Sequence, residues 1–205
     1  MSETSAPRTR VRATDSKHRL FTASMELIGA RGHHAVSVDE IAKAAGVSKG
    51  TVYYNFGSKS ELIAELFTYG VSILFERLER GATAADPYEG LEIMVGDSLE
   101  FIAQYPSFSQ LWISEQWQSD SQWAESLKSM RSEVIALVHQ TLTRLAAQQA
   151  AAPTQPTVDL QTLATAIFGA ALILGRDRVV FHPERSIENC LQAVMAFAAP
   201  LQARA

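Results

Sequence analysis

Residues 37–59 decide the fold of this chain, and they read SVDEIAKAAGVSKGTVYYNFGSK. Two short helices are expected here, because Ser37 and Glu40 have the spacing of a capping box and Ser48 is a typical N-cap residue. Between them, Gly46 supplies the left-handed residue that ends a helix and turns the chain. Two helices joined in this way predict a helix-turn-helix, a motif that places its second helix in the major groove of DNA.

Helical periodicity continues outward from this motif in both directions, and no segment alternates polar and apolar residues with a period of two. A capping box at Ser58 and Glu61 opens the next helix, and Asp86-Pro87 is a typical helix start. We therefore predict an all-α fold of about nine helices. After the helix-turn-helix, the expected helices are 59–80, 87–104, 106–118, 121–149, 158–180 and 184–199, with a Pro-containing linker at 150–157.

Length and composition indicate a globular protein, since 47% of the 205 residues are apolar. The single cysteine, Cys190, excludes an internal disulfide and a multi-cysteine zinc site. The N-terminus has basic residues but no apolar core, and the longest apolar run, 163–174, is shorter than the roughly 18–20 residues of a membrane span. We expect a soluble, cytoplasmic protein with no membrane partner, no metal and no cofactor.

Charge is distributed unevenly along the chain. Residues 1–59 carry nine Lys/Arg against five Asp/Glu, whereas residues 60–205 carry nine against seventeen, and the whole chain has a net charge of −4. A basic N-terminal part on an acidic remainder fits DNA binding at one end, because attraction to phosphate depends on local charge. Chance asymmetry in an ordinary protein would give the same numbers, so charge supports the motif without establishing it.

The second helix of the motif has the residue types that a reading helix needs. Short residues near its start let the backbone approach phosphates and base edges, and Lys49 can pair with phosphate or guanine. Tyr53 and Tyr54 offer rings and hydroxyls, although one ring could belong to the core, and Asn55 could instead cap the helix C-terminus. Ser37 and Ser48 could act only as caps. The predicted DNA contacts are Ser37, Ser48, Lys49, Gly50, Thr51, Tyr53, Tyr54, Asn55 and Lys59.

At residues 41–62, IAKAAGVSKGTVYYNFGSKSEL, the sequence closely resembles the tetracycline-repressor (TetR) family of bacterial transcriptional regulators. The resemblance covers about residues 15–65, and its mild departures are Asn55 and Gly57. It implies a homodimer that binds a near-palindromic operator, with residues 48–55 as recognition helix. It also implies three parts: a flexible basic arm (1–13), a helix-turn-helix DNA-binding domain (14–60) and a ligand-sensing and dimerisation domain (61–205).

Aromatic residues cluster between Phe101 and Met130, where all three tryptophans lie. Large rings can line a small-molecule cavity, although the same rings could simply form a packed core. Together with the sensing role that the resemblance implies, the cluster predicts a site for a mostly apolar or aromatic effector. The predicted ligand-binding residues are Phe67, Phe75, Met94, Phe101, Tyr105, Phe108, Trp112, Glu115, Trp117, Met130, Phe168, Leu172 and Arg176.

The last two helices are expected to form the dimer interface as a four-helix bundle, as the resemblance implies. Small residues along 158–180 permit close helix approach, but burial within one protomer would satisfy the same pattern. The predicted interface residues are Leu163, Ile167, Ala170, Leu174, Ile187, Leu191, Val194 and Met195.

An enzyme is disfavoured, because the five histidines are scattered and no phosphate loop, metal-ligand spacing or catalytic constellation is evident. The sequence predicts a ligand-responsive DNA-binding regulator, most simply a repressor. Two alternatives stay open: a DNA-binding regulator controlled by a protein partner or by abundance, and an activator on the same fold.

Overall fold

The computed structural model describes residues 8–118, 120–148 and 158–201, and within them it contains helices and no strand, as the sequence predicts. The helices are α1 (Arg8–Arg31), α2 (Val38–Ala44), α3 (Lys49–Phe56), α4 (Lys59–Ala82), α5 (Pro87–Gln104), α6 (Pro106–Glu115), α7 (Ala124–Gln148), α8 (Leu160–Val180) and α9 (Ile187–Met195), followed by a 3-10 turn, η1 (Ala199–Leu201).

Most predicted boundaries agree with the structure to within three residues, although α9 ends at Met195, four residues before the predicted end. Helix α1 begins at Arg8, so part of the arm expected over 1–13 is helical, while residues 1–7 lie outside the described residues. Helix α6 ends at Glu115 because successive turns follow it, in which the Gln118 amide donates to the Glu115 carbonyl. The predicted linker 150–157 also falls outside the described residues.

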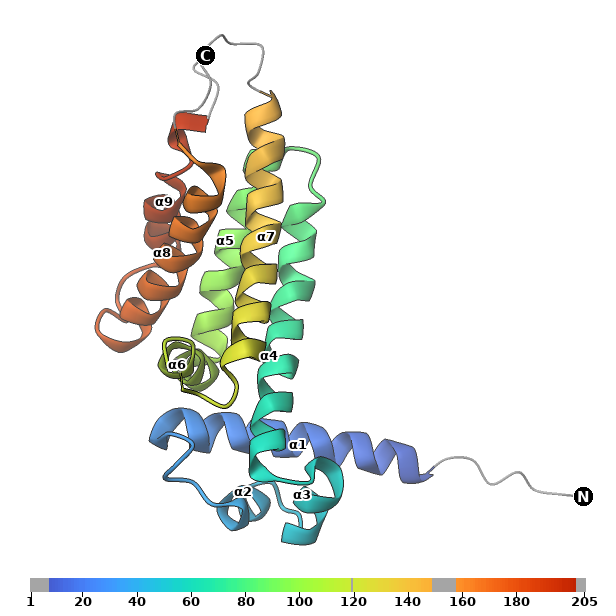
Figure 1. Ribbon diagram of the computed structural model, residues 1–205. Coiled ribbons are helices and arrows are strands. Elements are labelled where there is room, and N and C mark those ends of the chain that lie inside the picture. The colour runs from blue at the N-terminus through green and yellow to red at the C-terminus, as the bar shows by residue number, and fades with distance from the viewer. Residues whose placement is uncertain (1–7, 119, 149–157, 202–205) are drawn as a thin grey trace, which may run out of the picture.

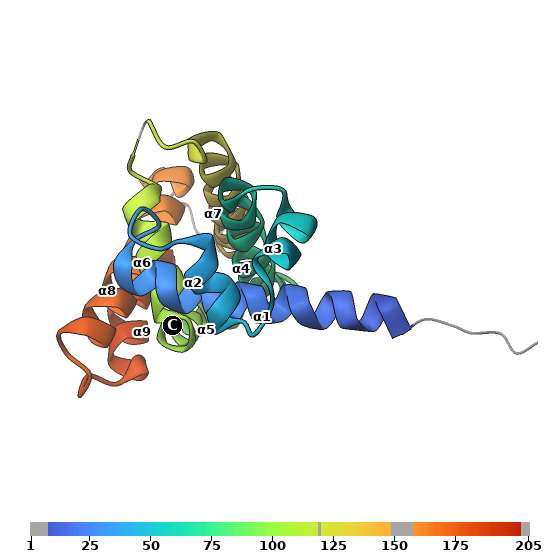
Figure 2. The same ribbon diagram turned by 90° about the horizontal axis from the view of Figure 1, so that it is seen from below.

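Helix α4 is the long element that joins the two ends of the molecule (Figure 1). Helix α1 crosses its N-terminal end, and α2 and α3 lie beyond α1. We call α1 to α3 with the N-terminal end of α4 the foot of the molecule, and the rest of α4 with α5 to α9 its body. Helices α5 and α7 run beside the upper part of α4, and α8 and α9 form an outer layer on α5. Figure 2, seen from below, places α2 and α3 in front and α8 and α9 to one side.

The hydrophobic core consists of two clusters, and neither coincides with the predicted domains. The first runs from Leu20 of α1 through α2, α3 and lower α4 to Trp112 of α6 and Leu127 of α7. The second joins upper α4 to α5, α7, α8 and α9. Packing is therefore continuous across residue 60, and a division into 14–60 and 61–205 remains a proposal based on sequence pattern.

Two glycines allow α6 to approach its neighbours closely. A Cβ atom at Gly29 of α1 would lie 2.2 Å from the Cβ of Ser107, and one at Gly70 of α4 would lie 2.2 Å from the Phe108 ring. Real Cβ contacts are never this short, so helix α6 sits directly on the backbones of α1 and α4. This contact joins the foot of the molecule to its body.

Candidate nucleic-acid interface and effector cavity

The turn between α2 and α3 is built from the local bonds that the sequence indicates. The capping box of α2 is complete, because the Ser37 hydroxyl accepts from the Glu40 amide (3.2 Å) and the Glu40 carboxylate accepts from the Ser37 amide (2.8 Å). These bonds, with Arg31, lower the pKa of Glu40 to about 2. Gly46 has a φ of +66°, and the Ser48 hydroxyl accepts from the Thr51 amide at 3.2 Å. The Ser48 cap therefore fixes the start of α3, and Gly46 fixes the turn that precedes it.

The second predicted capping box is only half formed. The Ser58 hydroxyl accepts from the Glu61 amide at 3.1 Å, as expected. However, the Ser58 amide donates to the Phe56 carbonyl at 2.8 Å, and the Glu61 carboxylate lies against Gly57 instead. The cap still fixes the start of α4, but through the serine alone.

Helix α3 turns one face inward and one outward. Val52 and Phe56 are buried in the first hydrophobic cluster, which agrees with their expected packing role. On the other side, 89% of Tyr54 and 45% of Tyr53 are exposed, the largest apolar exposures on this short helix. The protein leaves these rings without a core partner. An outward aromatic face on a helix of this kind is a surface suited to the sugar and methyl groups of a DNA groove.

Besides Ser37, Ser48 and Thr51, which bond locally, three further predicted DNA contacts have partners within the protein. The Lys49 ammonium forms an ion pair with Asp39 at 2.8 Å, which raises the pKa of Lys49. The Asn55 amide donates to the Thr51 carbonyl at 2.7 Å, inside the helix. The Lys59 ammonium donates to the His33 carbonyl, and desolvation there lowers the pKa of Lys59. Of these, the exposed Lys49 can exchange its carboxylate for phosphate with the least rearrangement.

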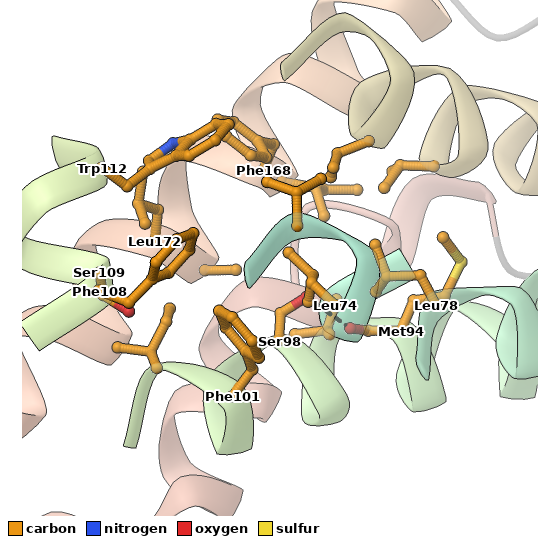
Figure 3. A pocket seen from close by; sticks show the side chains of 17 residues that line it. Leu74, Leu78, Met94, Ser98, Phe101, Phe108, Ser109, Trp112, Phe168 and Leu172 are labelled. Atoms are coloured by element: carbon orange, nitrogen blue, oxygen red, sulfur yellow. Dashed lines mark hydrogen bonds between the residues drawn. The ribbon is translucent and has the colours of Figure 1, made fainter. Parts of the chain in front are cut away.

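A cavity of about 60 Å³ lies among α4, α5, α6, α7 and α8 (Figure 3). Six predicted ligand-binding residues line it: Met94, Phe101, Phe108, Trp112, Phe168 and Leu172. The sequence therefore located the helices around the cavity and part of its aromatic wall.

The other seven predicted residues do not line this cavity. Phe67 is buried in the aromatic core, in edge contact with Phe108, Trp112 and Trp123. Phe75 and Met130 pack against the hydrophobic clusters, and the Tyr105 ring lies against Phe101 at a tilt of 47°. Trp117 is 71% exposed on the segment after α6. Arg176 donates to the Pro106 carbonyl, and Glu115 belongs to the cluster described below.

Sequence reasoning missed eleven lining residues: Val71, Leu74, Leu78, Val95, Ser98, Ile102, Ser109, Val134, Val138, Ile167 and Ala171. Most are aliphatic, and aliphatic residues at helical spacing signal a core as readily as a cavity wall. The helical repeat of Val71, Leu74 and Leu78 was visible, but it could not separate these two roles.

The cavity wall has almost no polar character. Its hydroxyl groups belong to Ser98 and Ser109, which donate to the Met94 and Tyr105 carbonyls of their own helices. No charged side chain lines it. Because a buried polar group without a partner is costly, this volume suits a carbon chain or ring and not a charged group.

A polar cluster ties the foot of the molecule to α6 and α7. The buried Glu115 carboxylate accepts from Ser121 (3.0 Å) and lies 3.2 Å from Nδ1 of His33, in the segment between α1 and α2. The Trp123 indole donates to the Ser60 carbonyl of α4 at 3.2 Å. Burial is the main cause that lowers the pKa of His33, although Glu115 opposes it. The cluster joins three segments that meet where α6 contacts α1.

Half of the predicted dimer residues are buried within a single protomer. Leu163, Ile167, Val194 and Met195 are buried within the protomer, where they pack α8 and α9 against α5 and α7. The predicted Ala170, Leu174, Ile187 and Leu191 are only partly buried and stay candidates. The apolar side chains left exposed on this layer are Ile173, Val180, Phe181 and Phe197.

The fold and these two sites define a class of protein: a helix-turn-helix unit joined to a helical body that contains an apolar cavity. Comparison with known proteins agrees. Residues 20–66, which include the helix-turn-helix, match the family model of bacterial regulatory proteins, tetR family.

Two curated relatives show how far the sequence likeness extends. The HTH-type transcriptional regulator AcrR of Shigella flexneri is 32% identical over 89 residues, covering 43% of this chain and 41% of AcrR. The fatty acid metabolism regulator protein of Bacillus subtilis is 36% identical over 61 residues, covering 30% of this chain and 31% of the relative. The chain thus spans less than half the length of these relatives.

Solved structures show the likeness of the whole fold. FadR of Bacillus halodurans, a fatty acid degradation regulator, has a TM-score of 0.78 and 20% identity, covering 98% of this chain and 100% of that one. FadR of Bacillus subtilis, solved in complex with stearoyl-CoA, has a TM-score of 0.77 and 20% identity, covering 91% and 99%. At this identity the likeness establishes the fold alone.

Proposed function

We propose that this protein is a ligand-responsive transcriptional regulator, a repressor that binds a near-palindromic operator as a homodimer in the bacterial cytoplasm. The observation that carries the proposal is the exposed aromatic face of α3, held by the capped turn in the part of the chain that matches the tetR family. Nine predicted contacts remain proposals, with Tyr53, Tyr54 and Lys49 the best placed. The curated relatives are transcriptional regulators and not enzymes, which supports this reading.

Dimerisation is supported by the outer layer. Ile173 is 58% exposed, and the α8 face that carries it also carries Gly169, where a Cβ would meet no atom within 4 Å. Exposed apolar residues beside small ones let a second helix pack closely. A two-fold dimer would place two α3 helices in half-sites one helical turn apart, about 34–36 Å. This face replaces the buried positions that the sequence suggested.

The effector site is the apolar cavity. Its volume of about 60 Å³ is less than the roughly 150 Å³ of a cavity known to bind benzene, so an effector must push the walls apart. Phe108 and Trp112 of α6 form one of these walls, and α6 rests on Gly29 of α1. Widening the cavity would therefore displace α6 and, through the Glu115 cluster, the foot of the molecule. An effector that binds the displaced state more tightly would weaken operator binding.

One experiment tests the DNA-binding proposal. Selection from randomised duplexes with the purified full chain should enrich paired, inverted half-sites with centres about 10 base pairs apart. On the selected duplex, Tyr54→Phe and Lys59→Ala should weaken binding for all sequences, whereas Lys49→Ala should also change base preference. Failure to enrich any paired site would contradict the proposal, and equal effects from all three variants would contradict the assigned roles.

A second candidate is a regulator with no small-molecule effector, and the small volume of the cavity favours it. A chain that binds the selected duplex but whose affinity no apolar compound changes would belong to this class. Repressor and activator differ in where the operator lies relative to the promoter, so a reporter with the selected site in its native position separates them.

A further inference from the structure

Buried polar atoms without partners occur on α7 and directly after α6, two of the helices that line the effector cavity. Within the described residues, four buried side-chain polar atoms lack a hydrogen-bond partner, and three of them belong to two residues: Oε1 and Nε2 of Gln116, and Nε of Arg131. Buried polar groups in folded proteins are almost always hydrogen-bonded, and leaving one unpaired is costly. Such groups indicate a place where a polar atom from outside the chain is bound.

Helical geometry places both residues at the same end of the cavity. On α7, Val134 and Val138 line the cavity, and Arg131 lies on the same helical face one turn before Val134. Where α6 ends, Gln116 follows Trp112 by four residues and so continues the face that carries this lining ring. The cavity-lining faces of α6 and α7 therefore each continue, one turn further along, to a side chain with an unpaired polar atom.

Two aromatic rings of the cavity wall, Phe168 and Trp112, connect this pair with the cavity. Phe168 and Trp112 lie together at one end of the cavity in Figure 3, far from Met94. The Arg131 guanidinium lies over the Phe168 ring, with its central carbon 5.4 Å from the ring centroid. No carboxylate of the described residues forms an ion pair with Arg131, so this cation rests on a ring of the cavity wall without an anionic partner.

We propose that the effector is an amphiphile, an unbranched chain or ring ending in a carboxylate. Its carbon part occupies the cavity, and its carboxylate receives hydrogen bonds from the Arg131 guanidinium and from Nε2 of Gln116. Arginine matches a planar carboxylate with two parallel donors, and such charge-assisted bonds are stronger than neutral ones. This inference rests on the proposed effector site and adds the ligand class and the residues that select it.

Binding of the carboxylate also has a structural consequence. Gln116 directly follows Glu115, whose carboxylate contacts His33 and Ser121. A ligand head group that draws Gln116 toward Arg131 pulls on the segment that holds this cluster. The head group is thus placed where its binding is communicated to α1 and the start of α4.

The test uses direct binding to the purified full chain without DNA. The probes are decanoate and 4-phenylbutyrate, each compared by calorimetry with the primary alcohol and the methyl ester of the same carbon skeleton. Wild type should bind each acid about tenfold or more tightly than its neutral counterparts, which corresponds to one charge-assisted hydrogen bond. Arg131→Met retains the packing on Phe168 without the charge and should abolish this preference.

Lys128→Met is the matched control, because Lys128 lies one turn before Arg131 on α7 and its side chain is 75% exposed. It removes the same charge from the same helix and should keep the preference for the acid. Arg131→Lys should retain part of the preference, and Gln116→Leu should reduce it, which provides two further variants should Arg131→Met not fold.

Equal binding of acid and alcohol by wild type would overturn the inference, as would an acid preference that survives Arg131→Met, or the absence of binding by every probe. The proposed function fails separately, in the operator selection. A protein that enriches paired sites and releases them with neutral compounds alone would keep the proposed function and lose this inference. Preference for a coenzyme A thioester over the free acid would have the same meaning.

Discussion

The foot of the molecule and its body contrast in how their residues acquire roles. In the foot, caps, turn glycine and exposed rings all lie between residues 37 and 59, and each role follows from near neighbours. In the body, the cavity takes its walls from five helices between residues 71 and 172. Local sequence therefore specifies a DNA-reading surface, while a ligand cavity depends on how distant segments meet.

The contrast is weakest at the contact of α6 with α1 and α4. There one hydrophobic cluster includes residues of both regions, and Glu115 pairs with His33 across the boundary. The foot and the body, whose sequence signals differ, thus share one hydrophobic cluster. The proposed switch requires such continuity, because a change in the cavity must reach α3 through packed side chains.

The largest expected effect tests the difference between a core ring and a surface ring. Phe67→Ala removes a ring that is 1% exposed and contacts three other aromatic side chains. It should lower the free energy of unfolding by about 3–5 kcal/mol, measured by urea denaturation. Tyr54→Ala is the counterpart in the foot and should change stability by no more than about 0.5 kcal/mol. Similar losses for both variants would remove the contrast.

The second effect concerns the boundary itself. Gly29→Ala places a Cβ within 2.2 Å of Ser107 and must force α6 away from α1, at a cost of about 1–3 kcal/mol in unfolding free energy. Gly50→Ala in α3 is the matched control, because the nearest atom to its Cβ is the Ser48 hydroxyl oxygen at 3.7 Å. Thermal unfolding should separate the two. If Gly29→Ala is as stable as the control, α6 does not rest on α1.

The smallest effect is a pH dependence at the same boundary. Burial lowers the pKa of His33 in the folded protein, so the unfolded chain takes up this proton first. The contribution of neutral His33 to stability is complete above its ordinary pKa of about 6.5 and is lost as pH falls through the lowered value.

Unfolding free energy should therefore decline as pH is lowered from about 7 toward 5, and His33→Gln should reduce that decline. Glu40 contributes little in this window, because the stability from its lowered pKa is lost only as pH falls below its ordinary value of 4.5. A decline of the same size in His33→Gln would assign the effect to other groups.

Much of the fold could be predicted from the sequence, because helix signals are local. Ser37 and Ser48 cap the helices that they were expected to cap, and Pro87 begins α5. The cavity residues were predicted less well. Trp117 has the same apolar chemistry as Trp112, yet one is exposed and the other lines the cavity. Their difference depends on where α6 ends, and the pattern around them did not reveal that point.

The dimer face illustrates the same limit. Ile167 and Ile173 lie on one helix, but only Ile173 faces outward, since α5 and α7 cover the other side of α8. Apolar periodicity identifies a helix that needs partners and does not say how many belong to its own chain.

The sequence by itself determined the helix-turn-helix, its caps and the all-α class, because caps, turns and helical periodicity operate over a few residues. Tertiary structure alone decided which rings enclose the cavity, which apolar residues remain exposed, and that polar atoms of Gln116 and Arg131 are buried without hydrogen-bond partners. These properties depend on the packing of helices that are distant in sequence. The type of a side chain does not identify the residue against which it will pack.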